Sequence, residues 1–138
     1  MPNDDDFSKA QAHLDARRGL EARALLTPLA EAGDARAQEL MSRLEETGSG
    51  GPRDLAASLR WCAAAAAQGS LAAIRRLGIK HRLGYGTPVN LDEAQAWLKK
   101  GMDRGDLDAL CELADLLRTR PSGERDPVEA ARLYRVGA

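Results

Sequence analysis

The chain has 138 residues, of which 43% are hydrophobic, 30% are charged and 4% are aromatic, and its formal net charge is −1. This length fits one domain with a buried core, and the near-neutral charge excludes a general attraction to nucleic acid or to an anionic membrane surface. The longest apolar run covers residues 61–67, whereas a membrane span needs roughly 18 such residues. Because the acidic N-terminus also lacks the apolar core of a signal peptide, we expect a soluble, cytoplasmic protein.

Helices are expected throughout the chain, because alanine is abundant and β-branched residues are scarce. Residues 1–6 are polar and acidic, and we predict a disordered tail there. Residues 7–32 carry leucines at helical spacing. They are predicted to form a divergent helical hairpin whose first helix ends at Gly19, since glycine commonly follows the end of a helix.

Three more helical hairpins follow, with predicted boundaries at residues 33–68, 69–104 and 105–138. In each repeat, apolar residues at i, i+3, i+4 and i+7 indicate a first helix, a loop with glycine or proline interrupts the pattern, and a second helix follows. The predicted helices cover about residues 35–46, 55–68, 71–83, 91–104, 107–118 and 127–138.

These hairpins repeat with a period of 36 residues. Gly33 aligns with Gly69 and Gly105, and Trp61 aligns with Trp97. Self-similarity at such a period is typical of a solenoid, in which one hairpin stacks on copies of itself. We therefore predict an all-α fold, a right-handed α/α superhelical solenoid of about seven to eight helices.

The aligned positions form a motif of small residues, loop glycines and one tryptophan. In the middle repeat the motif reads A-x-x-x-L-G, then G-x-G, then A-x-x-W. Small residues let two helices approach closely, and glycines accept the positive φ that follows a helix end. The positions expected to have this structural role are Ala73, Leu77, Gly84, Gly86, Ala94 and Trp97, with Trp61 in the first repeat and Leu113 and Ala130 in the third.

This motif resembles the Sel-one-like repeat family, whose members are built from 36-residue helical hairpins of the tetratricopeptide type. The resemblance implies a protein–protein interaction module, because such proteins commonly act as adaptors or scaffolds in bacterial signalling, envelope assembly, virulence and toxin–immunity pairs. The arginine- and alanine-rich composition is in keeping with a bacterial source.

Residues with catalytic chemistry are few and scattered. His13 and His81 lie on different predicted helices and outside any metal-ligand spacing. Cys62 and Cys111 also lie on different helices, and we expect both to be reduced, buried thiols. The pair Glu45 and Glu46 is expected to be solvated. We therefore predict that the protein is not an enzyme and holds no cofactor or metal.

Charge is distributed unevenly along the repeats. Residues 70–105 hold 7 basic and 3 acidic side chains, whereas residues 106–138 hold 5 and 7. On a helical wheel, one side of each first helix points away from the core, and the first helices of such solenoids line the concave surface. The predicted partner-binding residues are Arg75, Arg76, Ile79 and Arg82, with Glu39, Arg43, Glu46, Asp115 and Arg118 at equivalent positions.

Arginines beside an exposed isoleucine suit a protein interface, and a plainly solvated helix face is the other reading. We expect an adaptor that binds an acidic or mixed-charge segment of another protein. One alternative is an immunity or inhibitor protein that neutralises its partner. Nucleic-acid binding through the basic middle repeat is a weaker alternative, because the patch lacks aromatic residues for base stacking. Residues 128–136 are predicted to present an apolar helix face for self-association.

Overall fold

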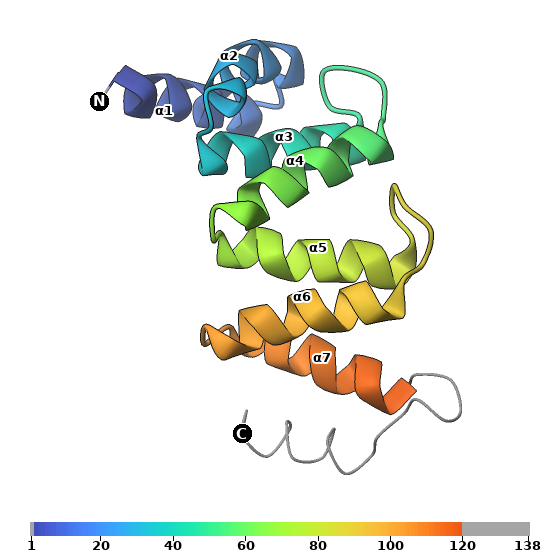
Figure 1. Cartoon of the computed structure of the whole chain (residues 1–138). Coiled ribbons are helices and arrows are strands. Elements are labelled where there is room, and N and C mark those ends of the chain that lie inside the picture. Colours follow the sequence, from blue (N-terminus) through green and yellow to red (C-terminus); the bar gives the residue numbers. More distant parts are fainter. Residues whose placement is uncertain (1, 120–138) are drawn as a thin grey trace. The chain divides into compact units, whose positions relative to one another are not determined.

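The structure, a computed structural model, describes residues 2–119, and these form seven α-helices without a strand (Figure 1). The helices are α1 (Pro2–Asp15), α2 (Gly19–Glu31), α3 (Ala35–Thr47), α4 (Leu55–Ala67), α5 (Leu71–Leu83), α6 (Leu91–Asp103) and α7 (Leu107–Thr119). This confirms the predicted all-α helical solenoid class. The predicted last helix, with Ala130 and the expected self-association face over residues 128–136, lies outside the described residues.

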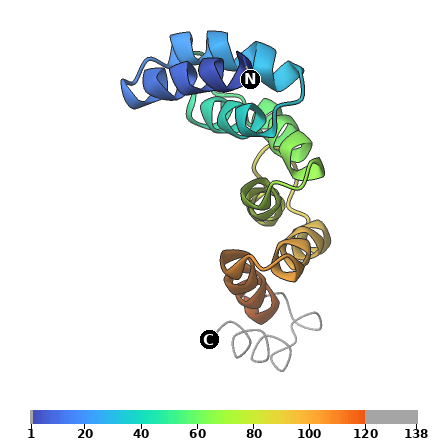
Figure 2. The same ribbon diagram turned by 90° about the vertical axis from the view of Figure 1, so that its left-hand side faces the viewer.

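The chain divides into two compact units, residues 1–70 and residues 71–138. In the first unit α1 packs on α2, α2 on α3 and α3 on α4, and in the second unit α5 packs on α6 and α6 on α7. Within the second unit, α5 and α7 lie on one side and α6 lies on the other (Figure 2). Each unit is therefore a stack of successive helices in which every helix covers the apolar side of the next.

Helices α3 to α7 begin and end within one residue of the predicted positions, and α5 matches at both ends. Side-chain caps explain several of these starts. The carboxylate of Asp34 accepts a hydrogen bond from the backbone N–H of Arg36 at 2.9 Å, and Asp54 and Asn90 cap α4 and α6 in the same way at 3.0 Å. Caps of this kind are readable in a sequence because they stand directly before an apolar periodic run.

The glycines of the repeat motif have positive φ at the loops inside the hairpins. Gly48 and Gly50 have φ of 76° and 74°, and Gly84 and Gly86, one period later, have φ of 78° and 81°. A residue with a side chain is strained in this region, whereas glycine is not. The 36-residue spacing of glycines therefore reflects a backbone conformation that recurs with the same period.

The first hairpin differs from the prediction at two places. Helix α1 begins at Pro2, so residues 2–6 belong to a helix and not to the disordered tail that we expected. Gly19 is the first residue of α2 and does not end α1; Arg17 makes that turn, with φ of 59°. A Cβ atom on Gly19 would lie 2.2 Å from Oγ of Ser49 and 2.7 Å from the backbone nitrogen of Gly50. Gly19 is therefore needed for the close approach between α2 and the loop that follows α3, which contains Ser49 and Gly50.

Each unit has its own hydrophobic core. In the first unit the core is formed by buried residues of α1, α2 and α3, and the half-buried ring of Trp61 on α4 packs against it. In the second unit the buried residues of α6 pack against those of α7. Several residues of the repeat motif are buried as predicted, namely Ala73, Leu77, Ala94 and Leu113.

Small residues lie where the two helices of a hairpin meet. Ser42 on α3 and Ser58 on α4 are buried, and the hydroxyl of each donates a hydrogen bond to the backbone carbonyl of the other at 2.8 Å. The equivalent positions in the second unit are Gly78 and Ala94. A Cβ atom on Gly78 would lie only 2.8 Å from Cγ of Leu98. Close helix contact therefore explains why the motif requires small side chains at these positions.

Candidate protein-interaction surface

The α5 face, defined as Arg75, Arg76, Ile79 and Arg82, is only partly available for a partner. The guanidinium of Arg75 lies 3.0 Å from Oδ2 and 3.1 Å from Oδ1 of Asp106, and 3.4 Å from the carboxylate of Asp108. The side chain of Asp106 is only 8% exposed and also accepts backbone hydrogen bonds from Asp108 and Ala109 at the start of α7. Arg75 thus holds the N-terminal cap of α7, which is a structural role.

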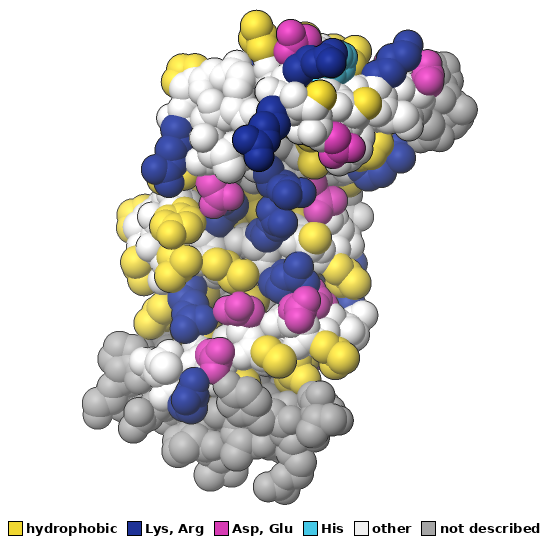
Figure 3. Space-filling view, turned by 180° about the vertical axis from the view of Figure 1, so that it is seen from behind, with side chains coloured by type: hydrophobic (Ala, Val, Ile, Leu, Met, Phe, Trp, Pro, Cys, Tyr) yellow, Lys and Arg dark blue, Asp and Glu magenta, His cyan; other side chains and the backbone are white. Residues whose placement is uncertain are grey.

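Arg82 also pairs with α7. Its guanidinium lies 3.2 Å from the carboxylate of Glu112. On α7 itself, Arg118 lies 2.8 Å from the carboxylate of Asp115, one turn away. Lys and Arg side chains lie beside Asp and Glu side chains on this side of the molecule (Figure 3). The basic band that the sequence predicted is therefore partly neutralised by carboxylates of the neighbouring helix.

Arg76 and Ile79 remain on the α5 face. Both are half-buried, so Ile79 is less exposed than predicted. Arg76 makes no ion pair with any described residue. Sequence analysis missed Lys80, which is only 4% exposed and stands at the position of Leu44 and Leu116 in the flanking repeats. Alignment of the repeats would have found it, because a lysine there replaces a core leucine.

The first unit carries the α3 face, defined as Glu39, Arg43 and Glu46. Arg43 is exposed, and Glu39 and Glu46 are half-buried. Beside this face, the C-terminal halves of α1 and α3 enclose an open pocket of about 290 Å³. Its lining residues are Gln11, Leu14, Asp15, Leu40, Arg43, Leu44, Thr47 and Ser49. Sequence analysis did not predict this pocket, because α1 falls outside the repeat motif and no periodic signal relates it to α3.

Two opposite charges line the pocket from different helices. Asp15 belongs to α1 and Arg43 to α3, and both side chains are exposed. Neither residue forms an ion pair with the other or with any further residue in the described part of the chain. Both charges are therefore available to an occupant of the pocket.

A partly buried ion pair supports residues 48–50, the loop at one end of the pocket. Arg23 on α2 pairs with Glu45 on α3, and it also donates a hydrogen bond to the backbone carbonyl of Ser49 at 3.1 Å. Glu45 is buried, so the prediction that it is solvated is wrong. The reason is that α2 covers this side of α3 and supplies an arginine at the contact. This pair fixes Ser49, one of the residues that line the pocket.

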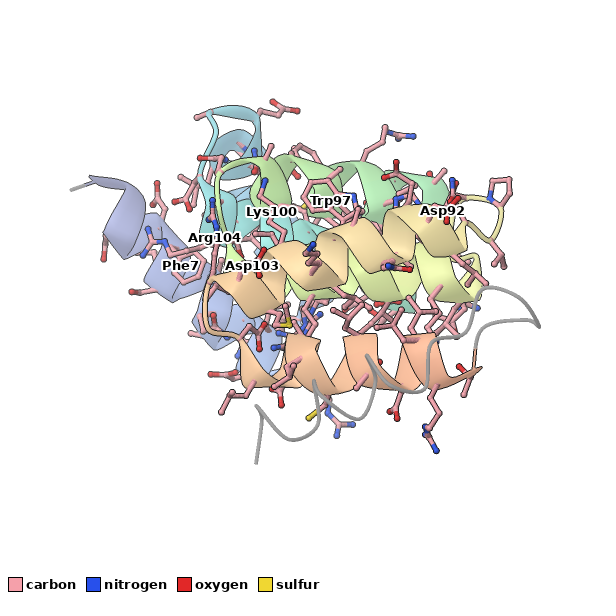
Figure 4. The ribbon with its side chains drawn as sticks, turned by 60° about the horizontal axis from the view of Figure 1, so that its bottom comes forward. Phe7, Asp92, Trp97, Lys100, Asp103 and Arg104 are labelled. Carbon is pink, nitrogen blue, oxygen red and sulfur yellow. The ribbon has the colours of Figure 1, made fainter. Side chains whose placement is uncertain are left out.

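The second tryptophan of the motif lies on α6. Trp97 is half-buried, and Nζ of Lys100 lies 5.2 Å from its ring centroid (Figure 4). A cation at this distance from an aromatic face is attracted by the ring electrons. Trp97 is thus covered by a neighbour on its own helix, and this contact is explained by packing alone.

The described residues contain no cluster that could form a metal centre. No group of three or more His, Cys, Asp or Glu residues among them could hold a metal ion. Cys62 is buried as predicted, but Cys111 is exposed, so the prediction of a core thiol is wrong there. Cys111 lies on the side of α7 that faces away from the core formed with α6. Within residues 2–119, no helix is both long and apolar enough to cross a membrane.

Comparison with known families decides the relationship that the motif suggested. The family model described as Sel1 repeat matches residues 35–70, 71–106 and 107–138. The chain belongs to the Sel1 repeat family. The matched Sel1 repeats begin two residues after the predicted boundaries, at the first residues of α3, α5 and α7. Sel1 repeats are generally protein-interaction modules, which makes a binding scaffold the expected role of this fold.

Two solved structures share the fold. A Sel1 repeat protein from Oxalobacter formigenes is similar at 20% identity and a TM-score of 0.82, over 95% of this chain and 54% of that one. The c5321 protein, a protective antigen present in uropathogenic Escherichia coli strains that displays an SLR fold, is similar at 20% identity and a TM-score of 0.87. That match covers 98% of this chain and 30% of the other. The chain thus spans about half and about a third of these relatives, and no curated protein matches it.

Proposed function

We propose that this Sel1 repeat protein is a non-catalytic adaptor that binds a segment of a partner protein through the exposed side of its first helices. The observation that carries the proposal is that two exposed or half-buried arginines lack an ion-pair partner among the described residues. Arg43 on the α3 face and Arg76 on the α5 face make no ion pair within the described part of the chain. Arg43 lines a pocket together with three leucines, and Arg76 stands one helical turn before Ile79. Arginine beside apolar surface is a favoured composition for protein interfaces.

The predicted binding residues divide into two roles under this proposal. Arg75 and Arg82 hold α7 against α5 through carboxylates of their own unit, and Asp115 and Arg118 pair with each other. Binding is then assigned to Arg76, Ile79, Glu39 and Arg43. The mixture of free arginine with flanking glutamate favours a partner segment of mixed charge.

The ion pairs of Arg75 with Asp106 and of Arg82 with Glu112 also favour a protein partner over a nucleic acid. A phosphate backbone is bound by arranged, available cations, and each lost cation weakens that binding. Two of the four residues on the α5 face are screened by carboxylates at 3.0–3.2 Å. An acidic or mixed-charge protein segment needs fewer free cations than a nucleic acid does.

Capture of a partner with charge-reversed variants tests the proposal. The full chain would be used as bait in lysate of its source cells, as wild type and as Arg43→Glu and Arg76→Glu. Matched controls are Arg60→Glu and Lys99→Glu, because these residues are exposed on the second helices α4 and α6. We expect a specific protein to be captured by wild type and both controls and lost with at least one of the two test variants. Loss with the controls alone would contradict the proposal.

A further inference from the structure

We propose that the pocket between α1 and α3 binds one bulky apolar side chain of a partner segment, with a carboxylate of that segment on Arg43 and a basic group on Asp15. This inference rests on the proposed adaptor function and specifies where and what the first unit binds. The occupant is thus a short, dipolar peptide segment with a leucine, methionine or phenylalanine between an acidic and a basic residue.

The floor of the pocket accounts for the apolar anchor. Leu14, Leu40 and Leu44 line it, from α1 and α3. Leu40 and Leu44 are almost fully buried, whereas Leu14 is half-buried and still presents apolar surface. The volume of about 290 Å³ lies just below the range for small-molecule sites, roughly 300–1,000 Å³. An open pocket of this size suits one large side chain with its adjoining backbone.

The walls of the pocket account for the charges. Arg43 and Asp15 approach from opposite helices, are exposed and have no ion pair among the described residues. An occupant with a single charge would be attracted by one of these two side chains and repelled by the other. A segment with both charges complements both walls, and a carboxylate accepts two parallel hydrogen bonds from a guanidinium.

The pocket is held open by contacts outside it. Towards the N-terminal ends of the two helices, the guanidinium of Arg36 on α3 lies 4.4 Å from the ring centroid of Phe7 on α1. At the other end, Arg23 fixes Ser49 through its backbone carbonyl, and Gly19 lies against the same loop. A binding site that is already formed loses less conformational entropy when it is occupied. The structure therefore supplies shape as well as charge.

Selection from a random peptide library displayed on phage tests the inference without a known partner. The full chain would be immobilised, and affinities of enriched peptides would be measured by fluorescence anisotropy. We expect enrichment of a bulky apolar residue with an acidic residue on one side and a basic residue on the other. Arg43→Glu should weaken the best peptide at least about tenfold, as expected for loss of a charged anchor, whereas the exposed control Arg60→Glu should change its affinity less than about twofold.

A charge exchange makes the test directional. The double variant Asp15→Lys/Arg43→Glu should bind peptides in which the acidic and basic positions are exchanged in preference to the original ones. Circular dichroism and thermal melting of each variant would establish equal folding. An enriched motif that is indifferent to Arg43→Glu, or a failure to enrich any motif, would overturn the proposal. So would a wild-type dimer that Arg43→Glu converts to a monomer, since a second copy would then be the occupant.

The outcomes also separate this inference from the adaptor function. If the double variant still captures the cellular partner while Arg76→Glu does not, the adaptor function stands and the pocket assignment is wrong. If neither captures the partner, but only the double variant loses the selected peptide, the pocket assignment stands and the α5 face contributes separately.

Discussion

Arg17 makes the turn between α1 and α2 with φ of 59°, and it is the one non-glycine residue with positive φ among the described residues. The turns between successive hairpins also contain a residue with positive φ, and there it is a glycine, namely Gly33, Gly69 or Gly105. The left-handed backbone conformation destabilises the folded state by about 1–2 kcal/mol at a residue with a side chain. Glycine avoids this strain, but it also raises the conformational entropy of the unfolded chain, and this offsets part of the gain in stability.

We therefore expect Arg17→Gly to raise the free energy of unfolding by about 0.5–1 kcal/mol. The reverse change, Gly105→Ala, isolates the backbone effect, because a Cβ atom there would meet nothing within 4 Å while φ is 92°. It should lower stability by about 1–3 kcal/mol. Urea unfolding followed by circular dichroism measures both. An Arg17→Gly variant less stable than wild type would show that the arginine side chain compensates the strain.

Asp34 links stability to pH. Burial raises the pKa of its carboxyl. Hydrogen bonds from the Arg36 side chain and from the backbone N–H groups of Ala37 and Arg36 together lower the pKa by a larger amount, so it lies below its ordinary value of 3.8. The stability that ionised Asp34 contributes is therefore complete above the pKa of the unfolded chain. It is lost as the pH falls through the pKa of the folded state.

Asp34→Asn isolates this contribution, because asparagine is also a good cap but does not titrate. We expect the free energy of unfolding to favour wild type over the variant more at pH 7 than at about pH 2.5, where the carboxyl of the unfolded chain is protonated and part of this contribution is lost. Urea unfolding at the two pH values gives the difference. If the difference between the two proteins is the same at both pH values, the ionised cap has no special role.

At the scale of the helices, close contact between α5 and α6 depends on Gly78. A Cβ atom there would lie 2.8 Å from Cγ and 3.0 Å from Cδ2 of Leu98. Alanine normally stabilises a helix interior by about 1 kcal/mol relative to glycine. We nevertheless expect Gly78→Ala to lower the free energy of unfolding by about 1–3 kcal/mol, because overpacking is the larger effect. Thermal melting would check this, and a rise in melting temperature would contradict the close contact.

Arg75 and Arg76 are neighbours in sequence with different assigned roles. Arg75→Ala removes the partner of the nearly buried Asp106 and should cost about 1.5–3 kcal/mol of stability, the usual value for a hydrogen bond to a charged group. Arg76→Ala should cost less than about 0.5 kcal/mol, as for a surface change, but should weaken partner binding. Urea unfolding separates the two. Equal losses of stability would contradict the division of roles.

The periodic pattern of the sequence predicts the limits of the helices but not the contacts between them. The limits of α5 were predicted at both ends, because apolar spacing and flanking glycines are local signals. The pairing of Arg75 with Asp106 was not predicted, since it joins residues 31 positions apart on different helices. The pocket was missed for the same reason, and α1 carries no repeat motif that would relate it to α3. Local order was therefore predictable, whereas contacts between helices required the structure.

For the whole molecule, the proposed function makes the Sel1 repeats a scaffold whose exposed residues would select the partner. The family match covers residues 35–138, whereas α1 and α2 precede the first matched repeat. Helix α1 nevertheless contributes three of the eight residues that line the candidate pocket, and Arg23 of α2 holds Ser49, another lining residue. The specificity of this chain is therefore expected to reside partly in the hairpin that diverges from the repeat pattern.

Site-specific photo-crosslinking tests the central claim, that the exposed side of the first helices binds a partner protein, most directly. A photo-activatable phenylalanine derivative would replace Glu39 or Ile79 on the first helices and, as controls, Arg60 or Lys99 on the second helices. We expect one partner protein to be crosslinked from the first two positions and not from the controls. Crosslinks from Arg60 or Lys99 alone would contradict the account and place the interface on α4 or α6.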